Sequence, residues 1–247
     1  MKKIIPITRG SCKNQEYLIL LPPIRNKFAL EVATCKNSIK EKYFCMWLCI
    51  MILTMISCQN QTKQLELTKN ELKTNYQTSS SVDDAVKLAE FYNLKYTLKQ
   101  EQIEEGLKDI ALFKSLYPDE LKLHILEGNL YTVLGGAYAK KMDLEKAMRN
   151  ITKGFDIMDE LLNQYPDNSY FLIYRGINSV SVPKMFNRLQ YALSDLKKLI
   201  DMENTPDEIR ILAYTNYAKA LKMNKDKNGL KKLKGEFATQ YPHLKLK

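Results

Sequence analysis

Apolar side chains recur at every third or fourth position along most of the chain that follows residue 80. The longest stripe of this kind occupies residues 144–165, and shorter ones lie at 103–117 and 230–241. This period places the apolar side chains on one face of a helix. Runs in which polar and apolar residues alternate, as in a half-buried strand, are absent from the sequence. The pattern therefore predicts an all-α protein built from amphipathic helices.

Prolines divide this part of the chain into blocks. Three of them are followed by aspartate and two of these also follow a tyrosine; the set is Pro118, Pro166, Pro206 and Pro242. Proline ends a helix because it lacks the N–H group, and we expect the neighbouring aspartate to cap the next helix. Ser81 and Asp84 form a start signal, close to a capping box, for the first helix. Residues 81–247 are thus predicted to form about four antiparallel hairpins, which stack because one hairpin cannot bury its apolar face alone.

The segment Tyr131–Pro166 resembles a tetratricopeptide repeat. The residues that carry the resemblance are Tyr131, Leu134, Gly135, Tyr138, Ala147 and Ile151. In that family, glycine and alanine at such positions let two helices approach, and the aromatic residues fill the space between them. Phe155 departs from the pattern by replacing a small residue, and the closing Pro166 comes later than in the family. The resemblance implies an α-solenoid of tetratricopeptide-like hairpins and a binding role, and it leaves the ligand open.

The N-terminal part carries a different signal. Residues 43–57 contain no charge, they follow three lysines, and they are followed at once by Cys58. A basic stretch, a short apolar core and a small residue describe a secretory signal, whereas a membrane helix needs about 20 apolar residues. The end of this segment, Met55 to Cys58, resembles the lipobox of bacterial lipoproteins, which implies that Cys58 is lipidated. An uncleaved membrane anchor and a buried helix of a soluble fold are the alternatives.

These signals divide the chain into four parts. Residues 1–42 are a leader, either the product of an overextended start site or a long cytoplasmic tail. Residues 43–58 are the signal and lipobox, 59–80 are a polar tether, and 81–247 are the helical repeat domain. The excess of positive charge in the leader fits the cytoplasmic side of a membrane. The expected location of the repeat domain is therefore the extracytoplasmic face of a bacterial cell membrane.

Composition argues against several classes of function. Residues 1–57 hold nine Lys and Arg against three Asp and Glu, and the rest holds 29 against 25, which leaves little net charge there to attract nucleic acid. All five cysteines lie within the first 58 residues, and His124 and His243 are the only histidines. A cysteine nucleophile, a zinc site or a histidine-based catalytic set is therefore hard to build in the folded part. We expect no enzyme activity, no cofactor and no metal.

One stretch, 170–188, combines charges with apolar surroundings. Arg175 stands among apolar residues, and a buried arginine must be paired, for which the following helix offers Asp195. One interpretation is a structural Arg175–Asp195 pair. The other is a polar patch on the inner surface that receives a peptide or a small ligand, with tyrosines supplying contact area at low entropic cost. The candidate binding residues are Tyr131, Tyr138, Tyr174, Arg175, Asn178, Arg188 and Tyr214.

Together, these features predict a membrane-anchored scaffold. The chain resembles envelope lipoproteins in which such repeats act as scaffolds or accessory subunits of membrane complexes, among them the T-component lipoproteins of some solute transporters. The expected partner is a protein or peptide of the cell envelope. The alternative is a periplasmic small-ligand binder or an enzyme with a pocket around Arg175 and Arg188. A deep enclosed pocket would favour that alternative, and an open groove would favour protein binding.

Overall fold

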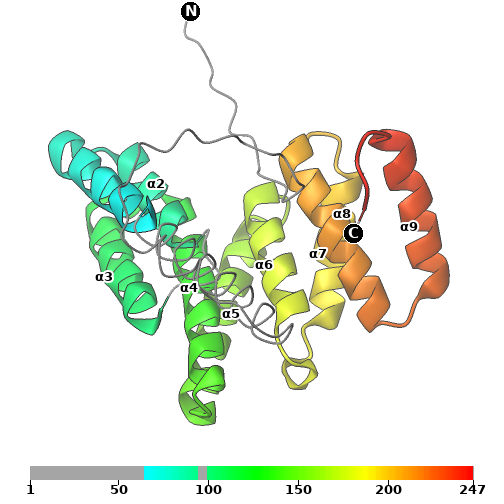
Figure 1. Ribbon diagram of the computed structural model, residues 1–247, viewed down its shortest axis with the longest axis horizontal. Coiled ribbons are helices and arrows are strands. Elements are labelled where there is room, and N and C mark those ends of the chain that lie inside the picture. Colours follow the sequence, from blue (N-terminus) through cyan, green and yellow to red (C-terminus); the bar gives the residue numbers. More distant parts are fainter. Residues whose placement is uncertain (1–63, 94–98, 247) are drawn as a thin grey trace, which may run out of the picture. The chain divides into compact units, whose positions relative to one another are not determined.

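Helices make up the regular structure of the residues that the computed structural model describes, 64–93 and 99–246 (Figure 1). They are α2 (Val82–Asn93), α3 (Gln100–Leu116), α4 (Leu121–Lys140), α5 (Leu144–Gln164), α6 (Ser169–Ser181), the 3-10 helix η3 (Lys184–Phe186), α7 (Leu189–Asp201), α8 (Asp207–Met223) and α9 (Lys227–Gln240). No strand occurs in these ranges, which agrees with the all-α prediction. No helix in the described ranges is long and apolar enough to cross a membrane. The predicted signal, 43–58, lies outside them.

Residues 64–79 form a further helix, which corrects the expectation of a polar tether over 59–80. Leu72 and Tyr76 lie four residues apart on one face and pack against the core. The Tyr76 ring lies 4.6 Å from the Phe113 ring of α3, measured between centroids. Beside this contact, Lys73 Nζ lies 2.5 Å from Glu105 Oε1. Both apolar and charged contacts therefore dock the helix 64–79 on α3.

The Tyr-Pro-Asp segments form turns, and their aspartates do not cap the following helices as expected. In the first segment, Glu120 N–H donates to Tyr117 O at 3.1 Å, so that proline and aspartate are the central residues of the turn. Glu120 then caps α4, and Asn168 has the same place before α6. The prediction was wrong by one residue because a turn needs two central positions. The start signal of α2 is confirmed, since Asp84 N–H donates to Ser81 Oγ at 3.2 Å.

Each helix packs against the next one along the chain, from α2 to α9 (Figure 1). Contacts of a second kind join alternate helices, namely α2 with α4, α4 with α6, and α6 with α8. The even-numbered helices are therefore neighbours of one another as well as of their partners along the chain. Side chains that are fully buried in this packing include Leu88, Ile110, Leu126, Leu172, Leu196 and Ala213.

Glycines let α4 and α5 approach closely. A Cβ atom on Gly154 would lie 2.5 Å from Gly128 O and 2.6 Å from Thr132 Cγ2. A Cβ atom on Gly135 would lie 2.5 Å from Ile151 Cγ1. These separations are well below van der Waals contact, so a larger residue at either position must displace its neighbours. Gly135 thus has the packing role that its place in the sequence suggests.

Candidate functional site

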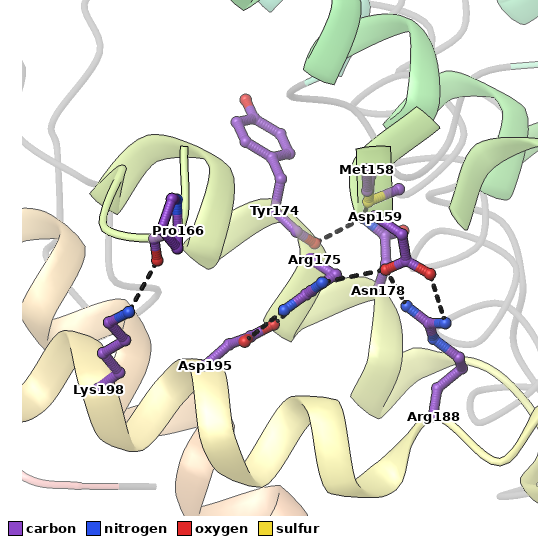
Figure 2. A network of polar contacts seen from close by, with 9 residues as sticks. All are labelled: Met158, Asp159, Pro166, Tyr174, Arg175, Asn178, Arg188, Asp195 and Lys198. Atoms are coloured by element: carbon purple, nitrogen blue, oxygen red, sulfur yellow. Dashed lines mark hydrogen bonds and ion pairs between the residues drawn. The ribbon is translucent and has the colours of Figure 1, made fainter. Parts of the chain in front are cut away.

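Arg175 projects from α6 and is held by carboxylates of two other helices (Figure 2). Its Nε and Nη2 atoms donate to Asp195 Oδ2 and Oδ1 of α7 at 2.7 and 2.8 Å. Its Nη1 atom donates to Asp159 Oδ1 of α5 at 3.1 Å. The Asp195 side chain is only 4% exposed, so this bidentate ion pair is buried. The structure therefore contains the Arg175–Asp195 pair that the sequence suggested.

Asp159 also binds Arg188, the residue before α7 (Figure 2). The Nη1 and Nη2 atoms of Arg188 donate to Asp159 Oδ2 and Oδ1 at 2.8 and 2.6 Å. The guanidinium lies 4.1 Å from the ring centre of Phe155 and 4.0 Å from that of Tyr191. The two arginines and two carboxylates thus balance in charge, and aromatic faces cover one arginine. Sequence reasoning missed Asp159, because α5 carries several acidic residues and only the packing of three helices selects this one.

The electrostatics of this cluster favour a structural role. Burial lowers the pKa of Arg175, but hydrogen bonds to Asp195 and Asp159 outweigh burial and leave the pKa above its ordinary value. The guanidinium therefore remains charged, and its charge is compensated by its neighbours. A charge that is already compensated has little left to offer a ligand. Geometry and electrostatics together support the structural interpretation of Arg175.

Asn178, also on α6, belongs to a row of three amides, of which Asn178 and Asn129 are buried. Its Nδ2 atom donates to Asn129 Oδ1 of α4 at 2.6 Å and to Tyr174 O at 2.8 Å. Asn129 Nδ2 in turn donates to Oδ1 of Asn93, the last residue of α2, at 2.5 Å. We call Asn178, Asn129 and Asn93 the amide ladder. It connects three of the even-numbered helices through side chains that are 36 and 49 residues apart in sequence.

A groove of about 490 Å³ lies beside the amide ladder, lined mainly by α4 and α6. We call it the α4–α6 groove. Most of its lining is apolar, Asn129 and Asn178 contribute amides, and the end of α4 adds Lys140 and Lys141. Gly136 also lines it, and a Cβ atom there would meet nothing within 4 Å. The groove is therefore open in front of Gly136, and its volume lies in the range of known ligand pockets.

The candidate tyrosines do not border this groove. They contact other helices or side chains instead: Tyr131 meets Lys153, Tyr138 meets Glu104, Tyr174 meets Tyr170 and Tyr214 meets Gln240. Burial raises the pKa of Tyr138 and of Tyr214, so both phenols remain neutral donors. Of the seven candidate residues, Asn178 alone lines the α4–α6 groove. The structure thus separates the candidates into an ion-pair cluster, a groove residue and dispersed tyrosines.

Comparison of the chain with protein families, curated proteins and solved structures found no match. The resemblance to tetratricopeptide repeats therefore stays a prediction. Within residues 64–93 and 99–246, no group of three His, Cys, Asp or Glu side chains is placed to hold a metal ion. Cys58, the predicted lipidation site, lies outside the described residues.

Proposed function

We propose that this protein is a membrane-anchored helical-repeat lipoprotein that acts as a protein-binding scaffold or accessory subunit of an envelope complex. In this proposal the described helices form a tetratricopeptide-like α-solenoid with hairpins α2–α3, α4–α5, α6–α7 and α8–α9. Contacts between alternate helices support the proposal, because stacked hairpins bring every second helix together. A lipid on Cys58 would hold the repeats at the extracytoplasmic face of a bacterial membrane.

The α4–α6 groove is the observation that carries the binding role. Among the described residues, Asn129 Nδ2 donates only to Asn93, so its second proton remains for a ligand. The apolar lining offers contact to side chains of the ligand. An extended segment of a protein presents both kinds of group, since its backbone carries C=O acceptors and its side chains can be apolar. The expected occupant is therefore a segment of a partner protein in the cell envelope.

One observation favours the alternative of a small-ligand binder. A second pocket lies beside Arg188, although Arg175 does not line it. The ion pairs of both arginines with Asp159 and Asp195 argue against a catalytic role for them.

Filling the groove tests the binding role. Gly136→Leu would place a side chain in the open space of the groove, and it replaces a poor helix former by a good one. Gly235→Leu is the matched control, because a Cβ at Gly235 of α9 also meets nothing within 4 Å and lies outside the groove. Envelope proteins would be cross-linked to each variant and quantified by mass spectrometry. We expect a partner whose capture falls at least tenfold in the first variant alone; equal capture by both variants would remove the groove from the proposal.

Intact mass and acyl labelling of the membrane-extracted protein test the anchor. We expect an acylated chain that begins at Cys58, and we expect the label to disappear in Cys58→Ala. An unlipidated chain that retains residues 1–57 would contradict the lipoprotein assignment.

A further inference from the structure

The second pocket, of about 410 Å³, lies where the connection between α6 and α7 meets the turn between α8 and α9. Its lining includes Lys184, Arg188 and Lys225 but no Asp or Glu side chain. Arg188 is paired with Asp159, whereas Lys184 and Lys225 are exposed. The pocket therefore has an excess of positive charge. We call it the α7 pocket, because the first residues of α7 form one of its walls.

Two buried polar atoms in this lining lack a hydrogen-bond partner among the described residues, Ser179 Oγ and Arg188 Nε. Ser179 is 2% exposed, so its hydroxyl is shielded from bulk water. Leaving a buried donor unpaired typically costs about 1–3 kcal/mol, and such groups are few in folded proteins. Both residues line the α7 pocket, so their unpaired donors lie at its wall.

The start of α7 adds further donors. The first backbone N–H groups of a helix have no acceptor within the helix, and no side chain caps α7. Leu189 and Gln190, in its first turn, line the pocket, so the positive end of the helix dipole lies at its wall. On the opposite side α8 ends, but the N–H groups of Asn224, Lys225 and Asp226 already occupy carbonyl oxygens of its last turn. Three carbonyl groups at this end of α8 are therefore already hydrogen-bonded.

We propose that the α7 pocket binds the phosphoryl group of a small organic phosphate. A phosphate oxygen accepts several hydrogen bonds, which matches a site that combines a hydroxyl, an Arg N–H, helix N–H groups and two lysines. The volume exceeds that of the phosphoryl group alone, and Val182, Pro183 and Met223 offer apolar contact to the organic part. This inference does not depend on the α4–α6 groove or on the lipid anchor. The phosphate site can therefore be wrong while the proposed scaffold function is right, and the reverse also holds.

Calorimetric titration of the full chain with inorganic phosphate and with glycerol 3-phosphate tests the proposal. Ser179→Ala removes the buried hydroxyl, and the double variant Lys184→Gln with Lys225→Asn removes the two exposed charges. Asn is chosen at position 225 because Lys225 has a φ of 59°, a left-handed conformation that asparagine tolerates. Lys231→Gln is the control, since Lys231 is an exposed lysine of α9 outside the pocket. Arg188 is left unchanged because its loss would also break the ion pair with Asp159.

Both test variants should bind the two phosphates at least tenfold more weakly than the wild type and the Lys231→Gln control. In phosphate-free buffer, Ser179→Ala should unfold at the same temperature as the wild type or higher, because it loses an unpaired hydroxyl. Equal affinities in the wild type, the two test variants and the control would overturn the proposal. It would also be overturned if the wild type bound neither phosphate nor the vesicles described below.

Vesicles separate the two sources of a phosphoryl group. Binding to phosphatidylglycerol vesicles that is lost in the same variants, without binding of either soluble phosphate, would assign the site to a lipid headgroup. Binding of soluble phosphate, with vesicle binding equal in the wild type and the variants, would assign it to a free metabolite.

Discussion

The α4–α5 and α6–α7 hairpins are neighbours; both contain a close approach at a glycine, and the second adds a buried ion-pair cluster. In α4–α5 the two backbones meet at Gly128 and Gly154, where a Cβ atom on either glycine would crowd the other helix. In α6–α7 the helices are joined by Arg175 and Asp195, together with Asp159 from α5. Both solutions close a hairpin. The α4–α5 contact depends on close packing, whereas the α6–α7 contact also requires that each buried charge is paired.

Two of the four buried side-chain atoms that lack a partner among the described residues lie on the ionic side of this comparison. The other two, Thr205 Oγ1 and Arg210 Nε, lie just before α8 and in α8. Ser179 Oγ and Arg188 Nε belong to the α6–α7 hairpin, and neither end of the α4–α5 contact contributes an unpaired buried side-chain atom. The contrast suggests that the two hairpins respond differently to substitution, pH and salt.

Loss of Asp195 should have the largest effect. Asp195→Ala leaves Arg175, 13% exposed, with Asp159 as its remaining carboxylate, and we expect a loss of about 3 kcal/mol in the free energy of unfolding. Asp201→Ala on the same helix is the control, because its pair with Lys197 is exposed and should contribute no more than about 0.5 kcal/mol. Urea unfolding measures both. Similar losses in the two variants would mean that the buried cluster does not stabilise the hairpin.

A methyl group in the α4–α5 contact should cost less. Gly154→Ala would place Cβ 2.5 Å from Gly128 O, and we expect a loss of about 2 kcal/mol in spite of the better helix propensity of alanine. Gly136→Ala, on α4 and facing open space, should instead stabilise the protein by about 0.5–1 kcal/mol. The loss should be insensitive to salt because no charge is involved. A stabilised Gly154→Ala variant would show that the helices separate without cost.

The exposed charges that dock helix 64–79 on α3 should have the smallest effect. Glu105→Gln removes a carboxylate that meets Lys73 and Lys69, both partly exposed, and we expect a loss of about 0.5–1 kcal/mol or less. Amide exchange of residues 64–79, measured by mass spectrometry, would rise in this variant and with added salt. Glu71→Gln is the control, because Glu71 is exposed on the same helix. Equal exchange in both variants would mean that the contacts of Glu105 do not hold the helix 64–79 on α3, and that other contacts, such as Tyr76–Phe113, do so.

The contact of Glu105 with Lys73 and Lys69 predicts that the docking of helix 64–79 depends on pH. Burial raises the pKa of Glu105, but hydrogen bonds from Lys73 and Lys69 outweigh it, so the pKa lies below its ordinary value of 4.5. A carboxyl with a lowered pKa stabilises the fold above its unfolded pKa, and this contribution is lost as the pH falls through the folded value. The protection of residues 64–79, taken as exchange relative to the intrinsic rate at each pH, should therefore fall below about pH 4.5 in the wild type and change less in Glu105→Gln.

The sequence was a good guide to features that depend on neighbours along the chain. Helical periodicity, the start of α2 and the need of Arg175 for a carboxylate all follow from local patterns and from the cost of burying a charge. The helix 64–79 was missed because its polar composition concealed the spacing of Leu72 and Tyr76. The Pro-Asp turns were read one residue short, since the spacing of prolines does not show where a turn ends.

Features that depend on the meeting of three helices could not be predicted. Asp159 is chosen among the acidic residues of α5 by the positions of α6 and α7. Ser179 and Lys225 lie far apart in sequence, and only the packing of α6 against α8 brings their surroundings together. The candidate tyrosines show the converse, because residue type alone suggested them as binding residues, and none of them lines the α4–α6 groove. The large number of tyrosines in the sequence therefore did not show where these side chains lie in the fold.

The amide ladder has a consequence for how the hairpins can move. Its hydrogen bonds all point the same way, from Asn178 to Asn129 to Asn93, and the last amide donates to Ala89 O at 2.8 Å. Sliding α2, α4 or α6 by a single turn, about 5.4 Å, would break one of these hydrogen bonds. It would leave a donor and an acceptor without partners. The ladder thus opposes a shift of α2, α4 and α6 along one another.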